Sequence, residues 1–477
     1  MHRVLWLLGI SVLALLAAGF IVLASAGGGN GMRLYGDANH FLVRQAFWLA
    51  VSLPCLWAAS RFDYHKWREM PWLTVLMYLA VFAMLVGVLF CPETKGSRRW
   101  IGYGMFRVQP SELAKLAVVV ATAVYLDRKG WMLGKFWKGA VRAAFVVAVP
   151  VGLAVLEPDF GAAAVLGLAG AALFLLSGMR VMHFAMFAVI GVMAVGTLVA
   201  FNPNRMNRIH SWVRSSFQAA QDKSLVAASE KRAEESVAAL RKSPAYARPD
   251  VAAVAAEARA ALALARSVSD YKKGRALEEN VQNVLKEVAV RIGAEPPAFT
   301  GLRKSIAEQL RSRDKRKAAA HQLEMALVAI HDGGVAGRGF NNSRQKQQYL
   351  PEAHTDFIFA IGAEEFGLAF SLGLLGLFVA FFWCGIYISL HAPDRLGRLI
   401  AFGMSFLVFF QALFNIGVVT GCLPTKGIAL PFISYGGTNL LTAMIAVGFL
   451  FNVGRQIGLQ TSRVKSRISP VFSTQGV

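Results

Sequence analysis

The amino-acid sequence predicts an all-α polytopic membrane protein with about ten transmembrane helices. Three observations support this fold class. Hydrophobic residues make up 56% of the 477-residue chain and charged residues only 16%, against roughly 25% charged in soluble domains. About ten apolar runs have the roughly 17 to 25 residues that a helix needs to cross a hydrocarbon layer. Lysine and arginine gather in alternate connections between these runs.

The apolar runs fall into seven before residue 201 and three after residue 356. They cover approximately residues 4–26, 41–60, 71–91, 111–126, 140–156, 160–177, 181–201, 356–389, 398–420 and 428–453. The first run is too long for a signal-peptide core of about 7–15 residues, so we expect an uncleaved helix. The run at 356–389 exceeds one straight span, and we expect its first part to be tilted, broken or interfacial.

The distribution of positive charge predicts the orientation in the membrane. With the N-terminus in the cytoplasm, the inner segments hold about sixteen lysines and arginines and the short outer loops about six. We therefore expect both termini to be cytoplasmic. The chain then divides into transmembrane helices one to seven (1–201), a large extracytoplasmic loop (202–355), helices eight to ten (356–455) and a cytoplasmic tail (456–477).

The large outer loop differs in composition from the spans. It is rich in alanine, lysine, arginine and glutamate, which are strong helix formers, and it is punctuated by prolines. We expect a helical insertion at about residues 218–318. An apolar stripe at 275–293 either packs within the loop or docks a partner or anionic lipid, and the sequence leaves both alternatives open.

Composition and spacing exclude several classes of function. A net charge of +22 is typical of nucleic-acid binding in a soluble chain, but a mean hydropathy of +0.48 excludes that interpretation. The four cysteines lack the spacing of a zinc site and are too few for a disulfide scaffold. No Gly-Lys-Ser/Thr ending marks a nucleotide-binding loop. The sequence identifies no cofactor and contains no recognisable metal-ligand set, and it leaves a requirement for a divalent cation open.

Ionisable residues in or beside a membrane span are costly to place there, so each is a candidate for function. Glu112 and Lys115 share a helix face at the start of the fourth run. They form either a structural ion pair or a substrate contact, and a buried lysine suits a phosphate. Glu157 and Asp159 lie in a tight outer turn, where Asp159 is more typical of a helix cap than of a catalytic group.

The densest polar cluster leads into the eighth run. It comprises Glu352, His354, Asp356, Glu364 and Glu365. We expect Asp356 at the N-terminal end of a helix, where it is either a catalytic carboxylate or an ordinary cap. Just upstream, Arg344 and Lys346 follow a glycine-rich stretch and are candidates for binding an anionic headgroup.

Two other outer segments add candidates. Arg99 and Trp100 lie in the second outer loop, where an interfacial tryptophan with flanking cations is the commoner explanation. Residues 423–438, which include Ser434, bring proline- and glycine-rich backbone to the outer side of the last spans. Irregular backbone persists at that depth only where protein or a watery cavity covers it, so we expect a polar cavity that opens outward.

These motifs resemble those of the SEDS family (shape, elongation, division and sporulation), polytopic glycosyltransferases that polymerise peptidoglycan from lipid II. The resemblance rests on Arg99-Trp100, Gln109–Lys115, Glu157–Gly161, Leu350–Phe359 with Glu364-Glu365, and Leu430–Gly437. The motifs at 424–427 and 352–354 are more similar to the division members, FtsW, than to the elongation members, RodA. The insertion has no counterpart in the family pattern, and Thr438 stands where the family has serine.

The resemblance implies an inverting glycosyltransferase at the outer face of the bacterial cytoplasmic membrane, acting in septal wall synthesis. It implies that Asp356 is the catalytic carboxylate. The candidate substrate-binding residues are Lys115, Glu112, Arg99, Trp100, Arg344, Lys346, Glu352, His354 and Ser434. The implied partners are lipid II, the growing glycan strand, membrane lipid and a class B penicillin-binding protein with transpeptidase activity, together with further division proteins, and no nucleic acid.

Three other functions stay open at this point. A lipid II flippase would need polar groups accessible from both faces, whereas the candidate clusters lie at outer helix ends and no inverted repeat is obvious. A scaffold that only recruits partners through its large loop would not need Asp356. An elongation-type wall polymerase would share the chemistry but not the septal role.

Overall fold

The computed structural model describes residues 1–92, 98–102, 104, 106–200, 322–346, 350, 353–424 and 427–472. The regular elements in these ranges are helices, and one isolated antiparallel bridge joins Ile101 to Val108. The chain separates into two compact units, of which Met1–Phe201 with Gln322–Val477 form the first. The second, Asn202–His321, lies outside the described residues, and so does the predicted helical insertion.

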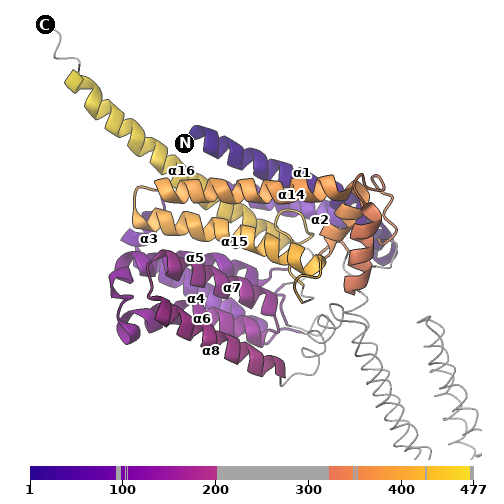
Figure 1. Ribbon diagram of the computed structural model, residues 1–477, viewed down its shortest axis with the longest axis horizontal. Coiled ribbons are helices and arrows are strands. Elements are labelled where there is room, and N and C mark those ends of the chain that lie inside the picture. Colours follow the sequence, from indigo (N-terminus) through magenta and orange to yellow (C-terminus); the bar gives the residue numbers. More distant parts are fainter. Residues whose placement is uncertain are drawn as a thin grey trace, which may run out of the picture. The chain divides into compact units, whose positions relative to one another are not determined.

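The first unit is a bundle of long helices that follow the predicted apolar runs in order (Figure 1). They are α1 (His2–Tyr35), α2 (His40–Arg61), α4 (Pro71–Val88), α5 (Pro110–Lys129), α6 (Val141–Leu156), α7 (Phe160–Leu176), α8 (Val181–Ala200), α14 (Ile358–His391), α15 (Arg395–Val419) and α16 (Gly437–Phe472). Short helical turns α3 (Lys66–Glu69), η1 (Gly130–Met132) and η2 (Phe136–Ala140) lie in the connections.

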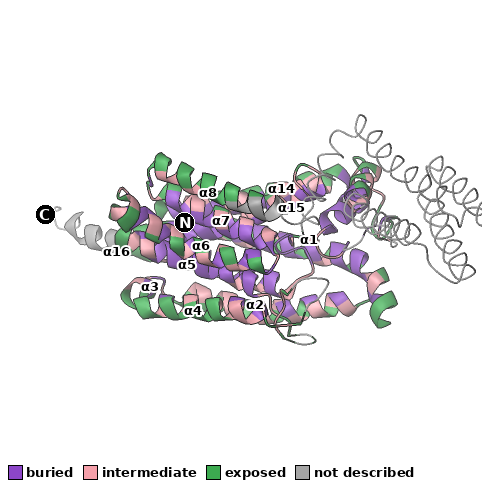
Figure 2. Cartoon of the chain, turned by 90° about the horizontal axis from the view of Figure 1, so that it is seen from below, coloured by how far each residue is buried: buried purple, intermediate pink, exposed green. Residues whose placement is uncertain are grey.

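Length and composition identify seven candidate membrane spans among the described residues: α1, α2, α4, α6 together with η2, α14, α15 and α16. Helix α7 and the first part of α8 are apolar but shorter. Helix α5 carries several charges, and most of its residues are buried by its neighbours (Figure 2). Because protein rather than lipid surrounds α5, it tolerates the ionisable side chains that an exposed span would not.

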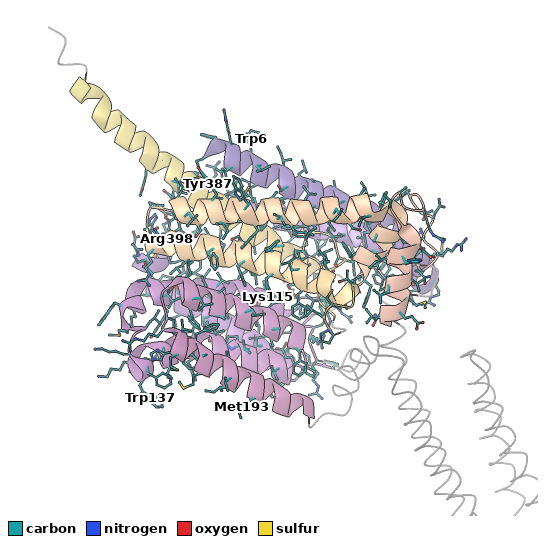
Figure 3. The ribbon with its side chains drawn as sticks, in the orientation of Figure 1. Trp6, Lys115, Trp137, Met193, Tyr387 and Arg398 are labelled. Carbon is teal, nitrogen blue, oxygen red and sulfur yellow. The ribbon has the colours of Figure 1, made fainter. Side chains whose placement is uncertain are left out.

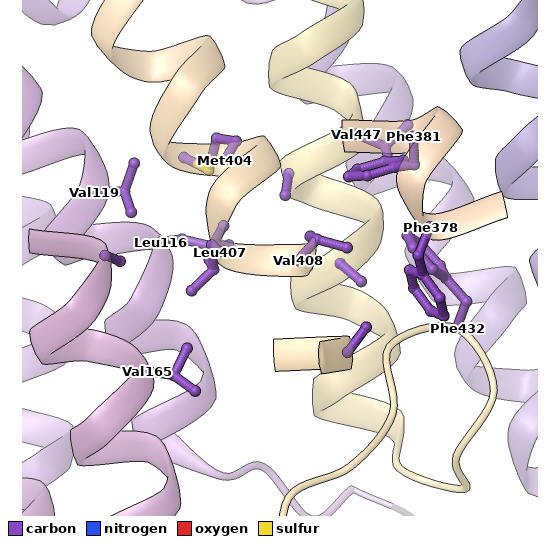
Figure 4. Close-up of a cluster of buried hydrophobic side chains, with 14 of the residues drawn as sticks. Leu116, Val119, Val165, Phe378, Phe381, Met404, Leu407, Val408, Phe432 and Val447 are labelled. Carbon is purple, nitrogen blue, oxygen red and sulfur yellow. The ribbon is translucent and has the colours of Figure 1, made fainter. Parts of the chain in front are cut away.

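Helix α15 joins the two halves of the bundle, because it packs against α14 and α16 on one side and against α5 and α7 on the other. The contact is a continuous apolar core (Figure 4). Its members include Leu116, Val119, Val165, Phe378, Phe381, Met404, Leu407, Val408, Phe432 and Val447. Lipid is as apolar as these side chains, so their close packing, rather than removal from water, stabilises the association.

Of the three alternatives expected for the first part of the eighth run, tilted, broken or interfacial, the structure shows a break, at Gly367, where φ is 74° and ψ is −165°. The amides of Arg338 and Gly339 donate to the freed carbonyls of Glu364 and Glu365 at 3.0 and 2.9 Å. A Cβ atom at Gly367 would collide with the carbonyl oxygen of Val335. Glycine therefore allows the loop at 335–339 to replace the missing helical hydrogen bonds.

Two helix boundaries differ from the prediction. Helix α1 continues to Tyr35 through a glycine-rich stretch. The backbone of Asp37 packs closely against Gly31, and a Cβ atom at Gly31 would lie 2.5 Å from the Asp37 carbonyl oxygen. Helix α16 begins at Gly437 rather than near 428. The residues before it, 427–436, form an irregular segment, which we call the 427–436 segment.

The bundle has two ends with different chemistry. The connections α2–α4, α5–α6, α7–α8 and α14–α15 meet at one end, which we call the Asp394 end. There Arg68 donates to Asp127 at 2.7 and 2.9 Å and to Asp394 at 2.7 Å, while the Tyr64 hydroxyl donates to Asp394 at 2.7 Å. Burial raises the pKa of the Tyr64 hydroxyl, and the hydrogen bond to Asp394 acts in the same direction.

Candidate functional site

Asp356 lies at the opposite end of the bundle, which we call the Asp356 end. It is half-buried in the turn at 353–357, two residues before α14 begins at Ile358. The chain thus places Asp356 at the N-terminal end of a helix, as expected. A carboxylate at such a position is stabilised by the partial positive charge of the helix terminus.

The 427–436 segment lies along this turn and holds its backbone. The Tyr435 amide donates to the His354 carbonyl at 3.1 Å, and the Ser434 hydroxyl donates to the Thr355 carbonyl at 2.6 Å. The Ser434 oxygen also accepts from the Leu430 amide at 2.7 Å. Ser434, a predicted substrate contact, therefore lies beside Asp356, with its hydroxyl engaged by backbone on both sides.

Glycine brings the start of the 427–436 segment into contact with Asp356. A Cβ at Gly427 would lie 2.5 Å from the Asp356 Oδ2 atom. On the other side, a Cβ at Gly161 of α7 would lie 2.5 Å from the Ile428 side chain and 3.3 Å from the Gly427 carbonyl oxygen. The carboxylate, the segment and α7 thus form successive layers, with glycine at each close approach.

The turn between α6 and α7 adds a second group of carboxylates. Asp159 caps α7 by accepting from the Ala162 amide at 3.3 Å, which confirms the predicted cap. It also accepts from Gln109 Nε2 at 2.8 Å and from the Ser111 hydroxyl at 3.1 Å, which ties the turn to the start of α5. Arg99 donates to the Pro158 carbonyl, and its Nη1 lies 4.0 Å from Asp159 Oδ1.

Glu157 is the most unusual group in this turn. It is fully buried, and neither of its carboxylate oxygens has a hydrogen-bond partner among the described residues. Burial raises the pKa of Glu157 to about 8; the negative charge of Asp159 adds to the rise and Arg99 opposes it. Burial therefore favours the protonated form of Glu157 over its carboxylate. The buried Nε of Arg99 also has no partner in the described part of the chain.

Glu112 and Lys115 form an ion pair in the interior, where α5 faces α15 (Figure 3). Lys115 is only 1% exposed, and its Nζ lies 2.7 Å from Glu112 and 2.8 Å from the Gln411 side-chain oxygen. The Gln411 Nε2 donates in turn to the Ala429 carbonyl at 2.9 Å. The pair therefore joins α5 to α15 and, through Gln411, supports the 427–436 segment.

Arg344 and Lys346 have different surroundings. The Lys346 Nζ lies 2.9 Å from Glu365 and 2.7 Å from the Ser25 hydroxyl, so it fastens the loop before Asp356 to α14 and α1. The Arg344 amide donates to Glu364 at 2.8 Å. Its side chain is exposed and has no ion pair among the described residues. Of the two predicted cations, Arg344 keeps its guanidinium available for an anion.

The other predicted contacts are placed less completely. Trp100 is half-buried in the connection between α4 and α5. The His354 ring packs against Phe41 with the ring centroids 4.3 Å apart. Glu352 lies outside the described residues.

Sequence reasoning missed the amides of α15, Gln411 and Asn415. Asn415 Nδ2 donates to the Asp356 carbonyl at 2.8 Å and to the Ile428 carbonyl at 2.6 Å. The available signal was their spacing, since two amides one helical turn apart are rare in an otherwise apolar run.

The described part of the chain contains no group of three or more histidine, cysteine, aspartate or glutamate side chains arranged to hold a metal ion. All four cysteines are free. A cavity of about 400 Å³ lies at the Asp394 end, lined by Leu176, Pro393, Asp394, Arg395, Arg398 and Leu399. The outward-opening cavity expected at the Asp356 end stays a prediction.

Comparison with known proteins shows that the sequence matches a described protein family. Residues 5–230 and 300–458 match the model of a cell cycle protein family that comprises FtsW, RodA and SpoVE. The unmatched residues 231–299 fall within the predicted insertion.

Two curated relatives cover almost the whole chain. The chain is 30% identical to a probable peptidoglycan glycosyltransferase FtsW of Pseudomonas fluorescens over 447 residues, which span 92% of this chain and 85% of the relative. It is 29% identical to the stage V sporulation protein E of Bacillus subtilis over 453 residues, which span 94% and 96%.

Two solved structures share the fold. One is the crystal structure of the rod shape determining protein RodA of Thermus thermophilus, with a TM-score of 0.55 and 20% identity over 94% of this chain and 96% of that one. The other belongs to a peptidoglycan synthase complex that coordinates polymerisation and crosslinking, with a TM-score of 0.56 and 21% identity over 95% and 98%.

Proposed function

The chain belongs to the cell cycle protein family of FtsW, RodA and SpoVE, and from this premise we propose that it is a peptidoglycan glycosyltransferase that polymerises lipid II into glycan strands. It is a multi-pass membrane protein. The observation that carries the proposal is Asp356, a carboxylate at a helix N-terminus in a turn that is hydrogen-bonded along the 427–436 segment.

In the proposed reaction, Asp356 takes the proton of a sugar hydroxyl as its oxygen forms a bond to the anomeric carbon of the donor. The bond between that carbon and the lipid pyrophosphate breaks, and the pyrophosphate leaves with the electron pair. A positioned base contributes about 10²–10⁴-fold to such a step. Attack opposite the leaving group, assisted by a single carboxylate, inverts the anomeric configuration, by analogy with inverting glycosidases.

A pyrophosphate leaving group needs cations more than it needs a general acid. Arg344 has an exposed guanidinium, and Arg99 has a buried Nε without a partner among the described residues, so these two arginines are our candidates for its charge. Lys115 and Lys346 are already paired with Glu112 and Glu365. We assign these two lysines to the support of the site.

The orientation in the membrane is also a proposal. Arginines and lysines of the connections concentrate at the Asp394 end, which the positive-inside rule places in the cytoplasm. The Asp356 end then faces outward, where lipid II and a penicillin-binding transpeptidase partner would meet it. The relation to a synthase complex that polymerises and crosslinks supports that partner, and the similarity to FtsW supports a septal role.

The proposal is tested with purified protein, a cognate transpeptidase partner and lipid II, with glycan strands resolved by length. Wild type should form long strands, and folded Asp356→Asn should lose at least about 10²-fold in rate because the base is gone. Full activity in Asp356→Asn would remove the assigned base. Movement of lipid II across vesicles without strand formation would instead favour a flippase.

A further inference from the structure

Helix α15 carries two buried amides, Gln411 and Asn415, one helical turn apart on the face toward the 427–436 segment. Asn415 is 1% exposed. A polar side chain in an apolar helix costs free energy unless its hydrogen bonds are made, so its partners indicate what it is there to hold.

Both hydrogens of the Asn415 amide are used. One is donated to the Asp356 carbonyl at 2.8 Å and the other to the Ile428 carbonyl at 2.6 Å. A single side chain on α15 thus holds the residue that carries the proposed base and the segment packed against that base.

The carbonyls of His354, Thr355 and Asp356 each accept a hydrogen bond. The first two bonds come from Tyr435 and Ser434, which belong to the 427–436 segment itself. Those bonds keep the turn and the segment together, and the segment is held in turn by Gln45 of α2 and Gln411 of α15. Of the three bonds to the turn, the one from Asn415 comes directly from a core helix, with no intervening segment.

We propose that Asn415 is a positioning residue that sets the place of the Asp356 carboxylate relative to the substrate. This inference rests on the proposed function. A general base must come within about 2.6–3.2 Å of the proton it removes. Movement of the Asp356 carbonyl moves the Cα and the carboxylate with it, and a misplacement of about 1 Å costs about 10²-fold in rate.

Asn452 of α16 provides a matched control at the Asp394 end. It is fully buried, and its Nδ2 donates to the carbonyls of Ala59 and Ser60, each at 3.0 Å, and to that of Phe62. Asn452 therefore holds the backbone at the end of α2 by hydrogen bonds to carbonyls, as Asn415 holds the turn at Asp356, but it lies far from the proposed chemistry. Its loss removes the same kind of hydrogen bond without touching the site.

The experiment compares Asn415→Leu with Asn452→Leu in the full chain, because leucine has the branched skeleton of asparagine without its hydrogen-bonding groups and leaves no cavity. Both variants should unfold at lower temperature than wild type. At equal amounts of folded protein, kcat for strand synthesis should fall about 10²-fold in Asn415→Leu, with KM for lipid II within about twofold. Asn452→Leu should keep the wild-type kcat.

If Asn415→Leu does not fold, Asn415→Ser replaces it, since serine keeps one donor, and its kcat should fall by an intermediate factor. A wild-type kcat in the folded Asn415 variant, or equal losses in the Asn415 and Asn452 variants, would overturn the positioning role. Wild-type protein that makes no strands would overturn the proposed function and the inference together. Active wild type with an active Asn415 variant overturns the inference alone.

Discussion

At the Asp394 end, Arg68 donates to both Asp127 and Asp394, and Tyr64 adds a further hydrogen bond to Asp394. At the Asp356 end, Glu157 is fully buried with no hydrogen-bond partner for either oxygen among the described residues. One oxygen of Glu365 is also buried at this end without a hydrogen-bond partner among the described residues. Buried polar groups are normally satisfied, so the carboxylates of the two ends differ in this respect.

We interpret the difference as one between an end built for stability and an end built for the proposed chemistry. At the Asp394 end, an ion network joins the α2–α4 connection, α5 and the α14–α15 connection, and both oxygens of Asp127 and of Asp394 accept a hydrogen bond. Unsatisfied carboxylates at the Asp356 end carry a cost that folding alone does not explain. Proteins depart from local rules chiefly at functional sites, which agrees with the proposed role of the Asp356 end.

The sharpest test of the comparison is Gly427→Ala, for which we expect the largest effect. The added Cβ would lie 2.5 Å from Asp356 Oδ2, so the carboxylate must move. We expect strand synthesis to slow about 10²-fold in folded protein. Gly29→Ala in α1 is the control, because a Cβ there meets no atom within 4 Å and should leave the rate unchanged. Equal rates in the two variants would show that the close approach of Gly427 has no catalytic consequence.

A second test perturbs the Asp394 end, where we expect a loss of stability but no loss of activity. Arg68→Ala leaves Asp127, whose side chain is 8% exposed, without its charged partner. We expect a loss of about 1–3 kcal/mol in the free energy of unfolding, with kcat for strand synthesis unchanged at equal folded protein. Arg128→Ala is the milder control, since exposed Arg128 donates only to a backbone carbonyl. A lower kcat in Arg68→Ala would mean that the Asp394 end also shapes the proposed site.

Sequence reasoning located the helices because a membrane demands long apolar runs, and each run contains a helix. It also named a break among the alternatives for the first part of α14, because the run was too long for one span. The glycine-rich end of α1 was missed, since glycine ordinarily weakens a helix and only the approach of Asp37 explains it.

The candidate site was predicted as a set of residues but not as an arrangement. The bond from Asn415 to Asp356 joins positions 59 residues apart, and no local pattern encodes it. Lys346 was expected at a headgroup, yet its nearest carboxylate is Glu365 of the broken helix. Pairing of this kind depends on which helices become neighbours, and propensity and periodicity do not determine that.

The smallest effect concerns the proton on Glu157, and it tests whether the unsatisfied carboxylate destabilises the Asp356 end. Its folded pKa of about 8 lies above the ordinary value of 4.5, so unfolding between these values releases a proton. Stability from this group is complete below about pH 4.5 and declines as the pH rises to about 8, by at most about 1.4 kcal/mol per pH unit.

Glu157→Gln has no proton to release. Its unfolding temperature minus that of wild type should therefore increase as the pH rises from 5 to 8. Thermal unfolding in detergent at several pH values measures the difference. Glu324→Gln, which changes an exposed carboxylate, should follow the wild-type curve. Parallel curves for Glu157→Gln and wild type would mean that Glu157 is ionised in the folded protein. The contrast between the ends would then rest on one oxygen of Glu112 and one of Glu365, each buried without a partner among the described residues.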